Sequence, residues 1–319
     1  MQINILEPDG FSKTALARLR ALGSVRCYQS APVRDFLSEA DILFVRLAHR
    51  LDGELLAAAP RLKIVVSPTT GHNHIDLDAL TRRNIRLLSL KGETEFLETI
   101  RATPEHTLGL LIALLRNYAG AFRSRTRAAW DRDTYRGEEL ADMNIGIIGY
   151  GRVGRRLAHY LRAFEARIRW FDPAPAKSAD DPGREDDIAR LIDWSRAVIL
   201  CASHDPAAPP ILDARKVGAL DGRYLVNSAR GELIDEEALL SAIEQGRLAG
   251  VAVDVICNEN GENRLSRWLD LSDTRNVIVT PHIGGATWSS MRATEEFMTD
   301  RLAELMEREG AQIFGLHSS

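Results

Sequence analysis

The sequence has little cysteine, no long apolar run and no excess of charge of either sign. Its three cysteines, Cys27, Cys201 and Cys257, contain no Cys-X-X-Cys motif, which argues against a disulfide framework and indicates a reducing compartment. No apolar run reaches membrane-spanning length, and the chain starts on a strand-like segment, so we expect no secretory signal. With 41 basic and 45 acidic residues, it lacks the basic surface of a nucleic-acid binder. We therefore predict a cytoplasmic protein without membrane or nucleic-acid partners.

Two series of short apolar runs alternate with amphipathic segments, which predicts an α/β fold with two parallel sheets. A length of 319 residues and a hydrophobic share of 45% are enough for two domains with separate cores. The strand-like runs of the first series are Ile3–Leu6, Val25–Tyr28, Ile42–Val45, Ile64–Val66 and Ile85–Leu88. Those of the second are Ile145–Ile148, Ile168–Phe171, Val198–Cys201, Tyr224–Val226, Val251–Val253 and Val277–Val279.

Helical patterns near the two junctions suggest where the domains divide. A long helix is predicted from about Pro104 to Tyr118, followed by an arginine-rich surface stretch, Arg123–Glu139, that is suited to a subunit contact. The last helix is predicted over Thr287–Arg308, ends at Gly310 and is expected to pack back on the first domain. We predict a discontinuous domain of residues 1–101 and 288–319, and a second domain of residues 102–287.

The segment after the first strand of the second series contains Gly-X-Gly-X-X-Gly at Gly149, Gly151 and Gly154. Such glycines permit a tight turn, a close approach of the backbone to a pyrophosphate, and close helix–strand packing. The next strand ends in Asp172, where an acid takes the ribose hydroxyls and repels a 2′-phosphate. The motif alone is weak, because a glycine turn can occur without a ligand, but its strand–helix context favours a Rossmann domain that binds NAD.

Three further polar residues each follow a strand of the second series. Arg230, Glu259 and His282 lie beyond the carboxyl ends of these strands, where open α/β sheets bind ligands. Arg230 would hold a substrate carboxylate and polarise a ketone. His282 would exchange the proton of the alcohol, and Glu259 would fix its tautomer. Taken singly, each has an ordinary alternative: a surface turn arginine, a solvated acid and a structural histidine.

At these residues the sequence resembles the D-isomer-specific 2-hydroxyacid dehydrogenase family, which includes D-3-phosphoglycerate dehydrogenases. The resemblance covers nearly the whole chain and is most specific over Val226–Asp235 and Thr280–Thr287. It implies Arg230, Glu259 and His282 as the catalytic set, a flavodoxin-like substrate domain beside the Rossmann domain, and a homodimer. The cofactor contacts that it implies are Arg152, Val153, Asp172, Ser228, Ala229, Asp254, Gly284 and Gly285, together with the glycine loop.

The departures from the family pattern lie on the substrate side. The usual glycine-valine-glycine loop is replaced by Ser67–Gly71, and Leu90–Glu93 stands in place of Asn-Ala-Pro-Gly. Thr69, Thr70 and Gly71 would still present backbone amides to a substrate carboxylate, with a plain tight turn as the alternative. Arg46, after the third strand, would read a second anionic group, unless it is simply a solvated arginine. The resemblance therefore does not identify the substrate, and we do not assign phosphoglycerate to this chain.

These features predict an oxidoreductase that moves a hydride between NAD and a small D-2-hydroxy acid or 2-keto acid. An NAD(H)-sensing module or corepressor on the same fold is the alternative, and the three candidate catalytic residues favour the enzyme. A formate dehydrogenase is disfavoured because the partner of the histidine would be Glu259 instead of glutamine. No metal is predicted: His72 and His74 form a His-X-His pair for which the sequence shows no third ligand.

Overall fold

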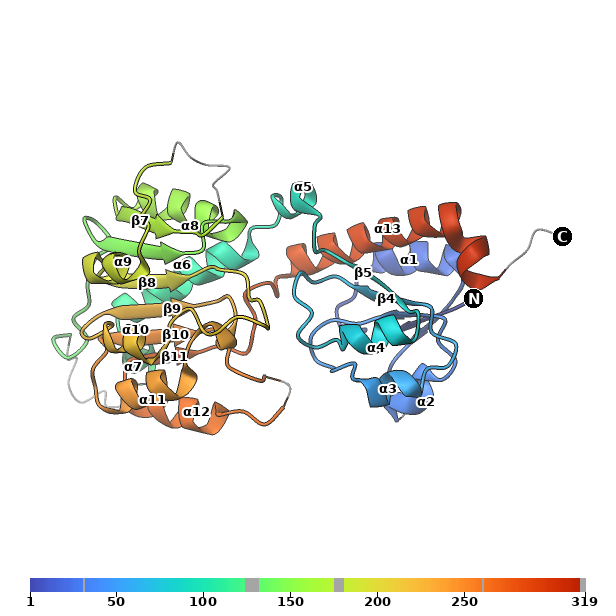
Figure 1. The fold of residues 1–319 in the computed structure, drawn as a ribbon, viewed down its shortest axis with the longest axis horizontal. Helices are drawn as coiled ribbons and strands as arrows, with labels where there is room; N and C mark the ends of the chain where they lie inside the picture. Colours follow the sequence, from blue (N-terminus) through green and yellow to red (C-terminus); the bar gives the residue numbers. More distant parts are fainter. Residues whose placement is uncertain (31, 124–131, 175–180, 260, 316–319) are drawn as a thin grey trace. The chain divides into compact units, whose positions relative to one another are not determined.

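The computed structural model describes residues 1–30, 32–123, 132–174, 181–259 and 261–315, and its contacts divide the chain into two compact units (Figure 1). Unit 1 comprises Met1–Ile100 and Ala286–Ser319, and unit 2 comprises Arg101–Gly285. Each unit is built on one parallel sheet, as the alternating pattern predicts. Among the described residues, no helix is both long and apolar enough to cross a membrane.

The sheet of unit 1 has five parallel strands in the order β2-β1-β3-β4-β5. This order is flavodoxin-like, so the prediction for this unit is confirmed. The strands are β1 (Gln2–Ile5), β2 (Ser24–Cys27), β3 (Ile42–Phe44), β4 (Ile64–Ser67) and β5 (Arg86–Ser89). The helices are α1 (Lys13–Leu22), α2 (Val33–Leu37), α3 (Gly53–Ala57), α4 (Leu77–Arg82), α5 (Thr94–Leu97) and α13 (Trp288–Phe314).

Two apolar clusters cover the two faces of this sheet. One joins α2, α3 and α4 to side chains such as Leu43 and Val65. The other joins α1 and α13 to Ile3, Phe44 and Val66 on the opposite face. The chain thus returns to unit 1 at its end, where α13 and α1 together cover one face of the sheet.

The sheet of unit 2 has six strands in the order β11-β10-β9-β8-β6-β7. A single-residue parallel bridge from Arg184 to Trp170 continues it beyond β7 and gives the Rossmann order 3-2-1-4-5-6 with one strand added. The strands are β6 (Asn144–Ile148), β7 (Arg167–Phe171), β8 (Ala197–Leu200), β9 (Tyr224–Asn227), β10 (Gly250–Val253) and β11 (Val277–Val279).

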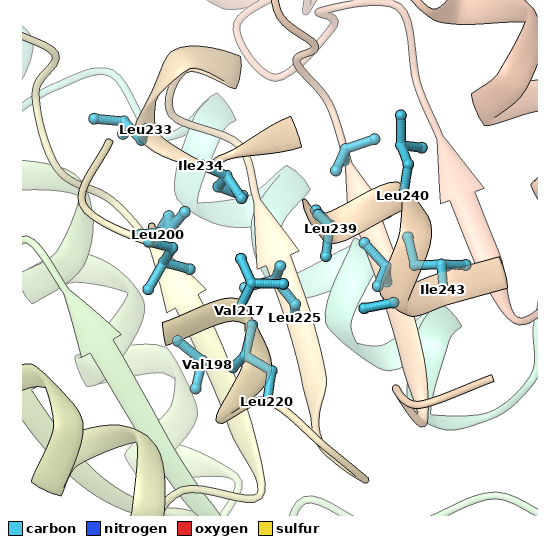
Figure 2. Packing of buried hydrophobic residues seen from close by; sticks show 14 of the residues in the cluster. Val198, Leu200, Val217, Leu220, Leu225, Leu233, Ile234, Leu239, Leu240 and Ile243 are labelled. Atoms are coloured by element: carbon cyan, nitrogen blue, oxygen red, sulfur yellow. The ribbon is translucent and has the colours of Figure 1, made fainter. Parts of the chain in front are cut away.

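Helices cover both faces of this second sheet as well. They are α6 (Ala102–Leu115), α7 (Tyr118–Arg123), α8 (Arg152–Ala163), α9 (Ile188–Trp194), α10 (Ala214–Gly218), α11 (Glu236–Glu244) and α12 (Leu265–Thr274), with a 3₁₀ turn η1 (Gly231–Leu233). α6 and α8 pack on one face, and α9 to α12 pack on the other. Figure 2 shows Ile234 near Leu200, and Leu233 is buried in the same cluster, so the turn after Arg230 is anchored in the core.

Two predicted helices have different ends in the structure. The helix predicted from Pro104 begins at Ala102 and stops at Leu115, because Asn117 adopts a left-handed conformation (φ 51°) before the short helix α7. The last helix continues through Gly310 to Phe314 and ends at Gly315, which is left-handed (φ 64°). Gly310 is buried, so packing outweighs the helix-breaking tendency on which the prediction relied. The predicted arm Arg123–Glu139 lies partly outside the described residues.

Candidate functional site

The glycine loop of unit 2 has the backbone geometry of a phosphate cradle. Gly149 is left-handed (φ 94°), and a Cβ there would lie 2.4 Å from the backbone nitrogen of Ala202. A Cβ at Gly154 would lie 2.2 Å from the carbonyl oxygen of Gly149, so α8 packs directly on the turn. Gly151 caps α8 without a side-chain hydrogen bond, and a Cβ there would meet nothing within 4 Å. The space beside the N-terminal glycine of α8 is therefore open, which suits the pyrophosphate of a dinucleotide.

Asp172, at the end of β7, is tied to this loop. Its Oδ2 accepts the backbone N–H of Tyr150 at 2.7 Å, and its Oδ1 accepts the N–H of Ala174 at 2.9 Å. Each carboxylate oxygen has further lone pairs, so the side chain retains acceptors for ribose hydroxyls. The Tyr150 ring stacks on Trp170 with centroids 4.1 Å apart, and burial raises the pKa of its hydroxyl to about 12. The loop and the acid thus form one rigid assembly that fits NAD.

Glu259 and His282 form a direct pair, as the predicted roles require. Oε2 of Glu259 lies 2.6 Å from Nδ1 of His282, and the two side chains are 30% and 24% exposed. This contact orients the imidazole and leaves Nε2 for another partner. The backbone N–H of His282 donates to the carbonyl of Asp254 at 2.8 Å, and the residue is left-handed (φ 53°). A non-glycine residue in this region indicates local strain of the kind found at functional sites.

A buried carboxylate holds the loop that carries His282. Asp254 is 1% exposed and accepts the Thr280 hydroxyl at 2.6 Å and the N–H groups of Ile283 (2.9 Å) and Gly284 (2.7 Å). Nε2 of His106, on α6, lies 3.2 Å from the same carboxylate. Burial raises the pKa of Asp254, but these partners outweigh burial and hold it below its ordinary value. A Cβ at Gly284 would lie 2.9 Å from Asp254 Oδ2, so the close approach requires glycine.

Arg230 is held at the end of β9 by its neighbours. The side chain of Asn227 accepts the N–H of Ala229 (3.0 Å) and donates to the carbonyl of Arg230 (2.8 Å), which closes the turn. Nη1 of Arg230 donates to the Ala229 carbonyl at 2.5 Å. Burial lowers the pKa of Arg230, while the charges of Glu259 and Glu232 oppose that shift. The guanidinium therefore lies in the field of the Glu259 carboxylate and stays protonated.

Glu236, at the start of α11, holds the segment that leads to Glu259, a role that the sequence did not indicate. Its buried carboxylate accepts the N–H of Cys257 and the indole N–H of Trp268, both at 3.0 Å. A Cβ at Gly231 would lie 2.1 Å from the backbone of Ile256, so the turn at Gly231 touches this segment backbone to backbone. An acid in the first turn of a helix such as α11 is an ordinary feature, so it carries no local sign of this role.

The other predicted cofactor contacts lie around the same edge of unit 2. Ser228 is buried, and its hydroxyl lies 2.6 Å from that of Thr107 on α6. A Cβ at Gly285 would meet nothing within 4 Å. The structure therefore places Glu259 in contact with His282 and within the electrostatic influence of Arg230. The glycine loop and Asp254 lie at the same edge of the sheet.

The predicted substrate contacts belong to unit 1. The Thr69 hydroxyl donates to the Gly71 carbonyl at 2.9 Å and lies 2.8 Å from the Ser67 hydroxyl, so the segment forms a closed turn after β4. Thr70 is exposed at its tip. Arg46 follows β3, but its guanidinium contacts Glu7 and Glu295 within the unit. It is therefore paired with two acids inside the unit, and its contact with a second anionic group of a substrate stays a prediction.

Residues 108–284 match the family model for the D-isomer specific 2-hydroxyacid dehydrogenase NAD binding domain. The D-3-phosphoglycerate dehydrogenase of Methanocaldococcus jannaschii is 28% identical over 97% of this chain and 59% of that protein. The hydroxypyruvate reductase of Thermotoga maritima is 30% identical over 80% of this chain and 81% of that protein. The structure of D-lactate dehydrogenase from Aquifex aeolicus, complexed with NAD and lactic acid, shares the fold over both whole chains at 24% identity (TM-score 0.83). The chain spans roughly half to three fifths of the phosphoglycerate dehydrogenases that it matches.

Proposed function

The chain belongs to the D-isomer specific 2-hydroxyacid dehydrogenase family, and on that premise we propose that it transfers a hydride between NAD and a small D-2-hydroxy acid or 2-keto acid. The observation that carries the proposal is the 2.6 Å contact between Glu259 and His282, held in a loop at the carboxyl edge of a Rossmann sheet. An imidazole with one nitrogen fixed by a carboxylate is suited to proton exchange with an alcohol.

In the direction of reduction, the residues of this chain would share the work at the ketone. Bound at the glycine loop, NADH would supply the hydride that adds to C2 of the keto acid. Nε2–H of His282 would donate the proton that the new alkoxide needs, and Glu259 would stabilise the imidazolium before that transfer. Arg230 would bind the substrate carboxylate through charge-assisted hydrogen bonds and polarise the ketone. Oxidation would reverse each of these steps.

Unit 1 is proposed as the substrate domain and unit 2 as the cofactor domain. The glycine loop, Asp172 and the matched family model lie in unit 2 and support its role. In unit 1 the turn at Thr69, Thr70 and Gly71 follows β4 at the carboxyl edge of a flavodoxin-like sheet, where ligands bind in open α/β folds. The relatives with the names hydroxypyruvate reductase and glyoxylate reductase support small 2-keto acids as the substrate class.

We also propose a homodimer and a cytoplasmic location. The stacked rings of Tyr118 and Phe122 on α7, with Phe122 80% exposed, support a subunit contact in unit 2. The three free cysteines support a reducing compartment. Light scattering of the purified chain tests the dimer, and a monomeric mass at micromolar concentration would contradict it.

The activity is tested by NADH oxidation, followed by absorbance, with glyoxylate, pyruvate and hydroxypyruvate as substrates. We expect turnover of at least one of them and a clear preference for NADH over NADPH, because Asp172 would repel a 2′-phosphate. Binding of NADH is measured in parallel by fluorescence. Tight NADH binding without turnover of any 2-keto acid would overturn the proposed activity in favour of a nucleotide-sensing module.

A further inference from the structure

Arg46 lies at the carboxyl edge of the sheet of unit 1, where a cation could contact an anionic ligand. It follows β3, next to β1, and these two strands flank the switch point of the sheet order. Ligands of open α/β sheets bind at the carboxyl ends of strands at such a point. Val45, just before it, donates its N–H to the carbonyl of Val66 on β4, so this loop borders the turn that contains Thr69.

Carboxylates and carbonyl oxygens of the unit itself already occupy this guanidinium. Nη1 lies 3.2 Å from Oε1 of Glu295 on α13, and Nε lies 3.5 Å from Oε2 of Glu7. Nη2 donates to the backbone carbonyls of Glu7 (2.7 Å) and Asp9 (3.0 Å). All three nitrogens are therefore engaged, and only 18% of the side chain is exposed.

The two carboxylates are themselves fixed in place. Glu295 is fully buried, and its Oε2 accepts the backbone N–H of Ser12 at 2.7 Å. Glu7 is 8% exposed and accepts the backbone N–H groups of Arg46 (2.7 Å) and His49 (3.1 Å). Backbone donors cannot swing away as long side chains do, so this arrangement is a built network.

We propose, resting on the dehydrogenase function above, that the network makes Arg46 unavailable to substrate and restricts this chain to 2-keto acids that carry no phosphate or second carboxylate. A second anion could pair with this guanidinium only in competition with Glu295 and Glu7. Displacing Glu295 would leave a buried charge without its partner, which is strongly destabilising. Before displacement, the anion would also face repulsion from Glu7 and Glu295, because one arginine is shared by two acids.

Arg50 is the other cation of this loop that bears on the proposal. It is exposed, and an exposed cation in water gains little from an ion pair. We therefore expect Arg50 to contribute little to substrate choice, and the variant Arg50→Gln tests this directly. If the wild type used a phosphorylated keto acid and Arg50→Gln abolished that use, the proposal would be wrong.

The first test uses the wild-type protein with matched substrate pairs. Hydroxypyruvate and its phosphate ester differ only in the phosphate, and pyruvate and oxaloacetate differ only in a carboxylate. We expect kcat/KM to be higher by about tenfold or more for the member of each pair that lacks the second anionic group. Equal or faster turnover of the members with the second anionic group would overturn the inference and leave the dehydrogenase function intact. Failure of all four keto acids would overturn the function itself, and the inference with it.

The second test opens the network. In Glu295→Gln the arginine loses its buried countercharge, so we expect the ratio of kcat/KM for phosphorylated over free hydroxypyruvate to rise by about tenfold. Glu296→Gln is the matched control, since it removes the same charge one residue away on α13, where Oε1 of Glu296 contacts the Ser12 hydroxyl. The control should change the ratio by less than about twofold. An equal rise of this ratio in both variants, or a rise in neither, would contradict the role of Arg46. Because both substrates are measured on the same preparation, loss of folded protein does not change the ratio.

Discussion

Each unit carries a histidine–glutamate pair just beyond the carboxyl ends of its strands. In unit 1, Nδ1 of His49 lies 3.1 Å from Oε1 of Glu7, and in unit 2, Nδ1 of His282 lies 2.6 Å from Oε2 of Glu259. Glu7 is only 8% exposed and also binds Arg46, whereas Glu259 is 30% exposed. The same two residue types therefore form an internal network in one unit and a reachable pair in the other.

The buried carboxylates behind these pairs differ as well. Burial raises the pKa of Asp254, but hydrogen bonds from His106, from Thr280 and from two backbone N–H groups hold it below its ordinary value. Burial raises the pKa of Glu295, because its partners Ser12 and Arg46 offset burial only in part. Similar burial thus has opposite consequences, and the number and kind of donors decide which one prevails.

The largest effect should appear when each of the two histidines is replaced by asparagine and the two values of kcat are compared. We expect His282→Asn to lower kcat by about 10²- to 10⁴-fold, because the general acid is lost. Asparagine tolerates the left-handed backbone of this position, so the loop is preserved. The matched change His49→Asn should alter kcat less than about threefold, since this histidine belongs to the internal network. Steady-state kinetics and NADH fluorescence titration check both variants, and retained turnover in His282→Asn would remove the distinction between the pairs.

An intermediate effect is expected on the free energy of unfolding when the glycine that donates its backbone N–H to Asp254 is replaced. Gly284→Ala places a Cβ 2.9 Å from Asp254 Oδ2 and should cost about 1–3 kcal/mol in the free energy of unfolding. Gly285→Ala meets nothing within 4 Å and should change it by less than about 0.5 kcal/mol. Urea denaturation of the two variants measures the difference, and equal losses would mean that the loop is not held by this contact.

The smallest effect should be the opposite pH dependence of the two buried carboxylates. A carboxyl group with a lowered pKa stabilises the fold above its unfolded value, about 3.9 for Asp, and this contribution is lost as pH falls through the folded pKa. The advantage of wild type over Asp254→Asn should therefore stay constant between about pH 7 and pH 5 and shrink only below about pH 4.

Glu295 has a raised pKa, so its ionised form disfavours the folded state. As pH falls through the folded pKa towards about 4.3, wild type should gain stability relative to Glu295→Gln. Urea denaturation at about pH 7, 5.5, 4.5 and 3.5 checks the sign in each case. If the stability of wild type relative to the two variants changed with pH in the same direction, the partners of Asp254 and Glu295 would not determine the sign of their pKa shifts.

Much of the fold follows from local patterns. Apolar runs such as Ile145–Ile148 predicted every strand of both sheets, because a buried parallel strand must be apolar on both faces. The predicted end of the last helix was wrong. The burial of Gly310 depends on tertiary packing and cannot be read from the local sequence. The proposed catalytic residues were found from their positions after strands, whereas Glu236 and His106 were given no role because their partners lie far away in the sequence.

By itself, the sequence determined the two α/β units, the glycine loop with Asp172, and the strand ends at which Arg230, Glu259 and His282 lie. These follow from residue periodicity and from glycines that only certain turns require. Only the tertiary structure decided that Glu259 meets His282 and that Arg46 is bound by Glu7 and Glu295. The reason is physical: whether a charge is available to a ligand depends on which opposite charges the fold places against it and on how deeply both are buried.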